Sequence, residues 1–471
     1  MGHGRLFRGI RIGILLAVIG QAGAQQSPFG PTTPKPSAWP GQHHVIFTFV
    51  DHWEPGVGRE AERLSEMWHS MYGEMARKHH DSDGKMPQHS WFCRYLERRP
   101  LQIISRSVYE GLGEMDVHIH HGSSNDDGVD NTVAMGNALD YYLAFLRKVG
   151  ACYSAEETPH TAFGFIHGMW ALDNSRATAT GTQYCGVNRE LDLLLSRGCF
   201  GDFTFPAWGT MQPTVYSRIY ASADGPEPKS YDYSWNQRFL GAGLGRFRQN
   251  ELLIFEGPGT ATNIDQNELP TIYRMNDWVA ADVHLPGREN WTFVKVYTHS
   301  AQAIQSGAQG VSSMMGEAAD QFFHDIERRY DDGVNSFLHY ASAREAVNMA
   351  LAAMDGLGGN PNDYRDYYYK RPVNRQFWCN AFYEVLTYGG ATSDTVICID
   401  DEVKTLELDS AAENGAMTIM EADAQDGPFH RCDGQISTSG EGTMRVHDST
   451  PSKYYKLMPR LLGARNWDLY R

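Results

Sequence analysis

The chain has 471 residues, of which 41% are hydrophobic and 21% are charged, a composition that excludes disordered, collagen-like and coiled-coil proteins. Its 41 basic and 57 acidic residues give a formal net charge of -16, which repels nucleic-acid phosphates and excludes a general nucleic-acid-binding protein. At ~150 residues per domain, the length suits about three domains or one large barrel with an appendage.

The first 24 residues have the features of a secretory signal peptide. Basic residues precede the apolar stretch Ile12–Ile19, and Ala22-Gly23-Ala24 forms a small-residue cleavage site. The apolar stretch is shorter than the ~20 residues that a membrane-spanning helix needs. We therefore expect a secreted or periplasmic protein without a membrane span, in which residues 25–41, rich in Pro, Ser, Thr and Gly, form a flexible leader.

Residues 42–371 show the alternation of an α/β protein. His44–Val50 is a continuous apolar and β-branched run, which is typical of a strand buried on both faces. Further apolar runs follow near residues 114–119 and 293–297, with helical patterns such as Ala134–Val149 between them. The alternation predicts a parallel β/α barrel, with an open sheet as the alternative, and places the working residues at the carboxyl ends of the strands.

The C-terminal part of the chain has a different pattern. From residue 372 to 471, short alternating runs are separated by Gly, Asp and Ser, which predicts a small all-β module. We expect this module to aid binding or packing rather than catalysis, because its acidic residues form no group with histidines beyond His430 and His447.

Two strand ends carry residue types that bind metals. In the segment Val117–His121, His118 and His120 are two residues apart, so on a strand they point the same way and can bind one metal ion. Asp51 and His52 end the first strand and add a carboxylate and an imidazole. Two histidines and one carboxylate, with open positions left over, are what a catalytic divalent metal requires.

Other strand ends offer groups for catalysis and substrate binding. His299 follows the buried run that ends at Tyr297 and could act as a general acid or hold an oxyanion. Trp170, Pro206 and Trp208 follow two further runs, and in a barrel they would form walls of a substrate cleft.

These segments, taken in order, carry a family resemblance. The series TFVDHWEP, EMDVHIHH, FIHGMW, DFTFPAW and KVYTHS resembles the polysaccharide deacetylases, the NodB-homology family of carbohydrate esterases, over roughly residues 44–344. The resemblance implies a distorted (β/α) barrel of about seven strands. It also implies metal-dependent hydrolysis of N-acetyl or O-acetyl groups on sugars, so that the partner is an acetylated polysaccharide or glycan.

The resemblance also implies residue roles. Asp51 matches the family's metal-binding acid, and Val50 replaces the acid that usually serves as the base. The family's paired histidines match His118 and, for the second, His120 or the neighbouring His121, with His118 and His120 preferred. His299 matches the late histidine, and of the groove-lining Arg-x-Pro segment only Pro206 is present.

The implied mechanism is attack of a metal-bound water on the acetyl carbonyl. Because Val50 cannot accept a proton, His52 and Glu54 are the candidates for the base. The ligand types favour zinc, with cobalt, nickel and iron as alternatives. Two other functions remain open: a catalytically silent carbohydrate-binding barrel, and a glycosidase using paired carboxylates such as Asp51 and Asp202.

Overall fold

The structure is a computed structural model. It describes residues 41–94, 96–120, 132–148, 151–155, 162–175, 187–207, 209–265, 268–305 and 314–371, together with seven short strands between residues 397 and 459. The predicted signal peptide and residues 25–40 of the predicted leader lie outside the described residues. In the part of the chain that is described, no helix is both long enough and apolar enough to cross a membrane.

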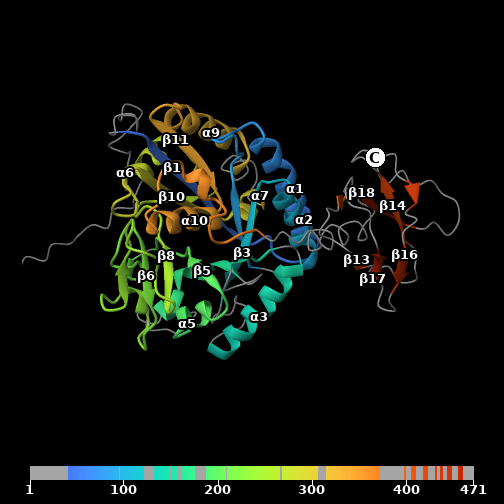
Figure 1. Ribbon diagram of the computed structural model, residues 1–471, viewed down its shortest axis with the longest axis horizontal. Coiled ribbons are helices and arrows are strands. Elements are labelled where there is room, and N and C mark those ends of the chain that lie inside the picture. The colour runs from blue at the N-terminus through green and yellow to red at the C-terminus, as the bar shows by residue number, and fades with distance from the viewer. Residues whose placement is uncertain are drawn as a thin grey trace, which may run out of the picture.

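A large, mainly parallel sheet organises the main part of the chain (Figure 1). Its strands are β1 (His43–Trp53), β2 (His89–Cys93), β3 (Gly113–Ile119), β4 (Phe163–His167), β5 (Cys199–Asp202), β6 (Ile219–Ala223), β7 (Gln237–Phe239), β8 (Glu251–Phe255), β9 (Asn263–Ile264), β10 (Trp291–Thr298) and β11 (Ser336–Ala341). The order is β7-β6-β8-β5-β4-β3-β2-β1-β10-β9, with β11 also paired to β1. Strand β6 runs antiparallel to both of its neighbours, β7 and β8, and the other described pairings in this sheet are parallel.

Strand β1 is the centre of the sheet. It pairs with β10 along residues 44–51 on one side. On the other side it pairs first with β11, over residues 43–48, and then with β2, over residues 49–53. All its residues are buried, as the continuous apolar run predicts for a parallel strand covered on both faces.

The sheet curves into a barrel-like shape. Seven parallel strands run in the order β8-β5-β4-β3-β2-β1-β10. The two outer strands of this series approach each other: the rings of Phe255 and Phe293 are 5.7 Å apart. Gly257, just after β8, lies so close to Lys295 of β10 that a Cβ there would overlap the Lys295 carbonyl oxygen. The α/β barrel-like fold expected from the sequence is confirmed.

Helices cover the outside of the curved sheet and close one end of it. They are α1 (Gly58–Ala76), α2 (Arg98–Tyr109), α3 (Thr132–Lys148), α5 (Glu190–Leu195), α6 (Ile272–Ala280), α7 (Ser300–Gln305), α9 (Glu317–Tyr330) and α10 (Ala343–Met354). In Figure 1, α1, α2, α3 and α9 lie at the periphery of the sheet. Helix α10 is different, because every one of its residues is buried.

The alternation of strand residues separates two apolar clusters. On β1, Phe47, Phe49 and Trp53 belong to the cluster that includes residues of α1, α2, α3 and α9, and so face outward. Ile46 and Val50 belong to the second cluster, which includes most of α10, and so face the barrel interior. Helix α10 therefore fills the interior at the amino ends of the strands, and the carboxyl ends are left for the site.

The C-terminal strands form two antiparallel sheets, and neither is part of the main sheet. They are β12 (Ile397–Cys398), β13 (Thr405–Asp409), β14 (Met417–Ala422), β15 (His430–Arg431), β16 (Gln435–Thr438), β17 (Thr443–His447) and β18 (Tyr454–Pro459). One sheet has the order β12-β18-β14-β15 and the other β13-β17-β16. This agrees with the all-β character expected there.

Candidate metal centre

Three side chains at the carboxyl ends of β1 and β3 meet at one point. The Oε1 atom of Glu54 is 3.0 Å from His118 Nε2 and 3.0 Å from His120 Nε2. The two imidazole nitrogens are also 3.0 Å from each other. These three residues could hold a metal ion, and we call them the Glu54 group.

Strand geometry explains why the two histidines converge. Val117 and Ile119 pack in the outer apolar cluster, so His118 and His120 point to the inside. His118 donates a hydrogen bond from Nδ1 to the Ile166 carbonyl oxygen, at 2.9 Å, which leaves the Nε2 lone pair directed at Glu54. A backbone acceptor of this kind is the usual support of a metal-binding histidine.

The donor set fits a divalent cation. One carboxylate oxygen and two imidazole nitrogens lie 3.0 Å from one another, so a single divalent cation could contact all three. Without a proton or a metal ion between them, the converging lone pairs would repel one another.

The charge state of the group agrees with a cation site. Burial opposes ionisation of Glu54, but the influence of the adjoining His118 and His120 outweighs it and holds the Glu54 pKa well below its usual value. Burial and the neighbouring His118 lower the pKa of His120 to about 4. Both lowered pKa values favour the forms that bind metals, an ionised carboxylate and a neutral imidazole.

A second histidine pair lies beside the Glu54 group. The ring of His52 is 4.6 Å from that of His118 and 4.7 Å from that of His299. His299 donates from Nδ1 to Asp265 Oδ1 at 3.3 Å, and its side chain is 26% exposed. Burial favours neutral His299, but Asp265 outweighs it and raises the His299 pKa above its usual value.

The structure does not bring Asp51 to the Glu54 group. Its position in β1 is odd-numbered like those of Phe49 and Trp53, so its side chain points outward. There Asp51 accepts hydrogen bonds from His89 Nε2, at 2.8 Å, and from the backbone and hydroxyl of Ser300. The carboxylate that meets the histidines is Glu54, which the sequence offered only as a base.

The expected cleft residues lie at the ends of β4 and β5, and both Trp170 and Pro206 are partly exposed. Trp208 and His121 lie outside the described residues. Trp170 is in a strained turn, because Met169 and Trp170 have φ values of 58° and 54°. Asp173, also at positive φ, braces this turn by accepting a hydrogen bond from the Ser230 backbone at 2.8 Å.

Three contributors to the site were missed by sequence reasoning. Gly168 leaves room for the His120 ring, since a Cβ there would overlap that ring. Asp265 orients His299, and Arg94 Nη1 is 3.7 Å from Glu54 Oε2. For Gly168 a signal exists, a glycine directly after a buried strand, whereas Asp265 is 34 residues from His299 and no local pattern links them.

A second group of metal-binding residue types lies near the amino end of β1. Asp81, Asp83 and His339 have ligand atoms close together. Arg365 already supplies a cation there, with Nη2 3.0 Å from Asp81 and 3.5 Å from Asp83. We interpret this group as a structural ion network.

Comparisons with known proteins find distant similarity in structure alone. No family model matches the chain, and no curated protein sequence matches it. One similar solved structure, described provisionally as a polysaccharide deacetylase from Mycobacterium smegmatis, is 12% identical, with a TM-score of 0.36, over 67% of this chain and 92% of that chain.

Two further solved structures are similar at lower scores. A 4-alpha-glucanotransferase from Thermococcus litoralis is 8% identical with a TM-score of 0.31, over 61% of this chain and 38% of that one. A glycosyl hydrolase family 38 protein from Enterococcus faecalis is 10% identical with a TM-score of 0.27, over 91% and 55%. The function proposed below rests on the site residues.

Proposed function

We propose that the protein is a secreted, divalent-metal-dependent hydrolase that removes acetyl groups from a polysaccharide or glycan. The observation that carries the proposal is the convergence of Glu54, His118 and His120 next to the hydrogen-bonded pair His299 and Asp265. Zinc is the first candidate for the metal, and cobalt, nickel and iron suit the same ligand types. A cation bound there supplies a Lewis acid that polarises a carbonyl and lowers the pKa of water.

The two outer histidines have complementary roles in this proposal. His299, whose pKa is raised by Asp265, donates a proton to the nitrogen or oxygen that leaves when the acetyl bond breaks. His52 lies between His118 and His299 and is the candidate to accept the proton of the attacking water. Glu54 contacts both ligand histidines, which favours a ligand role for it over the role of base.

Trp170 and Pro206 are the proposed contacts for the sugar, because both are partly exposed after strands that end at the same edge of the sheet. An aromatic face suits the apolar side of a pyranose ring. The strained turn fixes where Trp170 can lie.

The glycosidase alternative has less support. Asp51 and Asp202 are both fully buried and hydrogen-bonded within the protein, Asp51 to His89 and Asp202 to Thr204. Buried carboxylates with such partners cannot flank a glycosidic bond from both sides.

The test combines metal content with acetate release. Purified protein should contain one transition metal per chain and release acetate from an acetylated glycan, and His118→Ala/His120→Ala should lose both. His324→Ala is the matched control, because that side chain is 62% exposed on α9 and far from the Glu54 group in the sequence. Acetate release by the double variant would refute the proposal, and glycan binding without acetate release by the metal-loaded protein would favour a silent binding barrel.

A further inference from the structure

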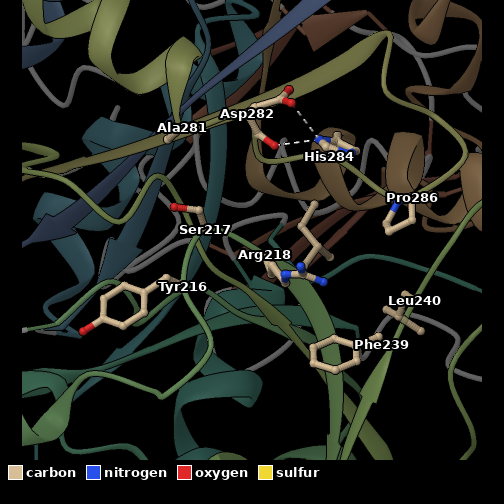
Figure 2. Close-up of a pocket in the computed structure, with 10 residues that line it drawn as sticks. Tyr216, Ser217, Arg218, Phe239, Leu240, Ala281, Asp282, His284 and Pro286 are labelled. Carbon is tan, nitrogen blue, oxygen red and sulfur yellow. Dashed lines mark hydrogen bonds and ion pairs between the residues drawn. The ribbon is translucent and has the colours of Figure 1, made fainter. Parts of the chain in front are cut away.

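A pocket of about 320 Å³ opens on the side of the barrel formed by β6, β7 and the segment after α6. It is lined by Tyr216, Ser217, Arg218, Ile219, Phe239, Leu240, Ala281, Asp282, His284 and Pro286 (Figure 2). The pocket includes none of the residues of the Glu54 group. It is therefore a separate candidate binding site, built on elements that the proposed chemistry does not use.

Arg218 is the main charged group of the pocket. Its guanidinium carbon lies 5.1 Å from the centre of the Phe239 ring. Within the described part of the chain, no carboxylate forms an ion pair with it. Figure 2 shows Arg218 between Phe239 on one side and His284 and Pro286 on the other. Stacking on an aromatic ring holds the plane of the guanidinium while its N–H groups stay available to a ligand.

His284 and Asp282 form the opposite wall. His284 Nδ1 donates to the Asp282 carbonyl oxygen at 2.6 Å and lies 3.3 Å from the Asp282 carboxylate, as the dashed lines in Figure 2 show. The Asp282 hydrogen bond raises the pKa of His284. Because Nδ1 is engaged, Nε2 is the ring nitrogen left for a ligand. The Asp282 side chain is 51% exposed and can accept hydroxyl hydrogens.

Exposed aromatic side chains add apolar contact area. Phe239 is 54% exposed and Tyr216 is 58% exposed, so both rings offer apolar surface to a ligand. A ligand for this pocket therefore needs one negative charge for Arg218, hydroxyl groups for Asp282 and a flat apolar face for the aromatic rings. A monoanion suits a site that already contains a carboxylate better than a doubly charged phosphate does.

We propose that this pocket binds a carboxylate-bearing sugar, a uronic acid unit of a glycan, with Arg218 pairing with the carboxylate and Phe239 packing against the ring. The choice of a sugar rests on the proposed function, but the site does not depend on the metal residues. A carboxylate matches the two parallel N–H groups of a guanidinium, which is the strongest form of this contact. The pocket would hold a glycan chain that carries acidic units while the Glu54 group acts on another unit.

Calorimetric titration of the full-length protein tests the proposal. A trimer of galacturonic acid should bind saturably, and a neutral galactose trimer should bind at least about tenfold more weakly, a difference of about 1.4 kcal/mol. Arg218→Ala should weaken binding of the acidic trimer about tenfold or more. Arg248→Ala is the charge-matched control, because its side chain is 75% exposed, its Nε atom is 4.0 Å from the Glu251 carboxylate, and it does not line the pocket.

Two further titrations separate this proposal from the enzymatic one. The His118→Ala/His120→Ala protein should bind the acidic trimer as the unaltered protein does, whether or not the protein is a deacetylase. Loss of binding in that variant would indicate that the trimer binds at the Glu54 group, and this would overturn the proposal. Equal binding of acidic and neutral trimers, unchanged binding by Arg218→Ala, or displacement of the trimer by an equal concentration of acetate would also overturn it.

Discussion

Gly168 has no side chain, and this leaves the space that the His120 ring of the Glu54 group occupies. A Cβ at Gly168 would overlap the His120 ring, so Gly168→Ala must displace that ring or the start of the turn after β4. We expect metal affinity to fall about 10–100-fold, as for other changes that disturb the support of a ligand. Metal titration of the apoprotein, followed by calorimetry, measures this directly.

Gly201→Ala on β5 provides the matched control for Gly168→Ala. The nearest atom to a Cβ at Gly201 is 3.6 Å away, an ordinary contact, so this change should leave metal affinity unaltered. If both variants bound metal like the unaltered protein, close packing of Gly168 against His120 would not position the ligand.

His299 gives the pH dependence of the proposed reaction. It must be protonated to act as an acid, so activity is lost as pH rises through its pKa. Asp265 raises that pKa, and Glu54 and Asp51 add smaller favourable charges. Asp265→Asn should therefore lower the pKa and move the loss of kcat to lower pH, while Asp265→Glu should largely restore the original profile. If kcat fell at the same pH in Asp265→Asn as in the unaltered protein, another group would donate the proton.

Helix α10 is anchored in the barrel by a buried ion pair between Arg344 and Glu114. Arg344 is fully buried and donates from Nε and Nη2 to the Glu114 carboxylate, with Nη2 2.7 Å from Oε1. Its Nη1 also donates to the Tyr369 carbonyl oxygen at 2.6 Å. The helix begins with a capping box between Ser342 and Glu345. These contacts join β3, α10 and the segment before residue 371.

Arg344→Met should destabilise the protein by about 3–5 kcal/mol, because it leaves the Glu114 charge buried with fewer partners. Arg371 still binds Glu114 at 2.6 Å, so we expect the decrease in the free energy of unfolding to be about 3 kcal/mol. Denaturant unfolding measures the change, and the Arg344→Met/Glu114→Gln double variant should recover part of it. No recovery would indicate that shape and packing, rather than the buried charge, determine the cost.

The two-residue period of a β-strand explains why His118 and His120 converge as expected and why Asp51 does not join them. Applied to β3, a period of two selects His118 and His120, which do converge. The same period applied to β1 selects His52 and, one step past the strand, Glu54, whereas Asp51 faces the outer helices. The family pattern and the strand period disagreed at Asp51, and the geometry follows the period. Asp265 could not be found this way, because it meets His299 only through the pairing of β9 with β10.

The described site residues all come from the part of the chain before residue 372. The Glu54 group, His299 and Asp265 lie at or just after the carboxyl ends of strands of the main sheet, and α10 closes the interior behind them. The unit that carries the proposed chemistry must therefore include β11 and α10, although they contribute no residue to the site. The barrel boundary expected near residue 371 stays a prediction.

A truncated chain tests that boundary, and two contacts decide where to cut. Lys370 pairs with Ser154 through backbone hydrogen bonds, and Arg371 binds Glu114, so a chain that ends at Arg371 retains both. We expect this truncated protein to keep the metal affinity of the full chain and its turnover of small acetylated substrates. A chain ending at Gly356 loses the Tyr369 and Arg365 contacts that satisfy Arg344, and it should unfold at a lower denaturant concentration. If the chain ending at Arg371 also lost metal binding, the C-terminal strands would be part of the catalytic unit rather than a separate module.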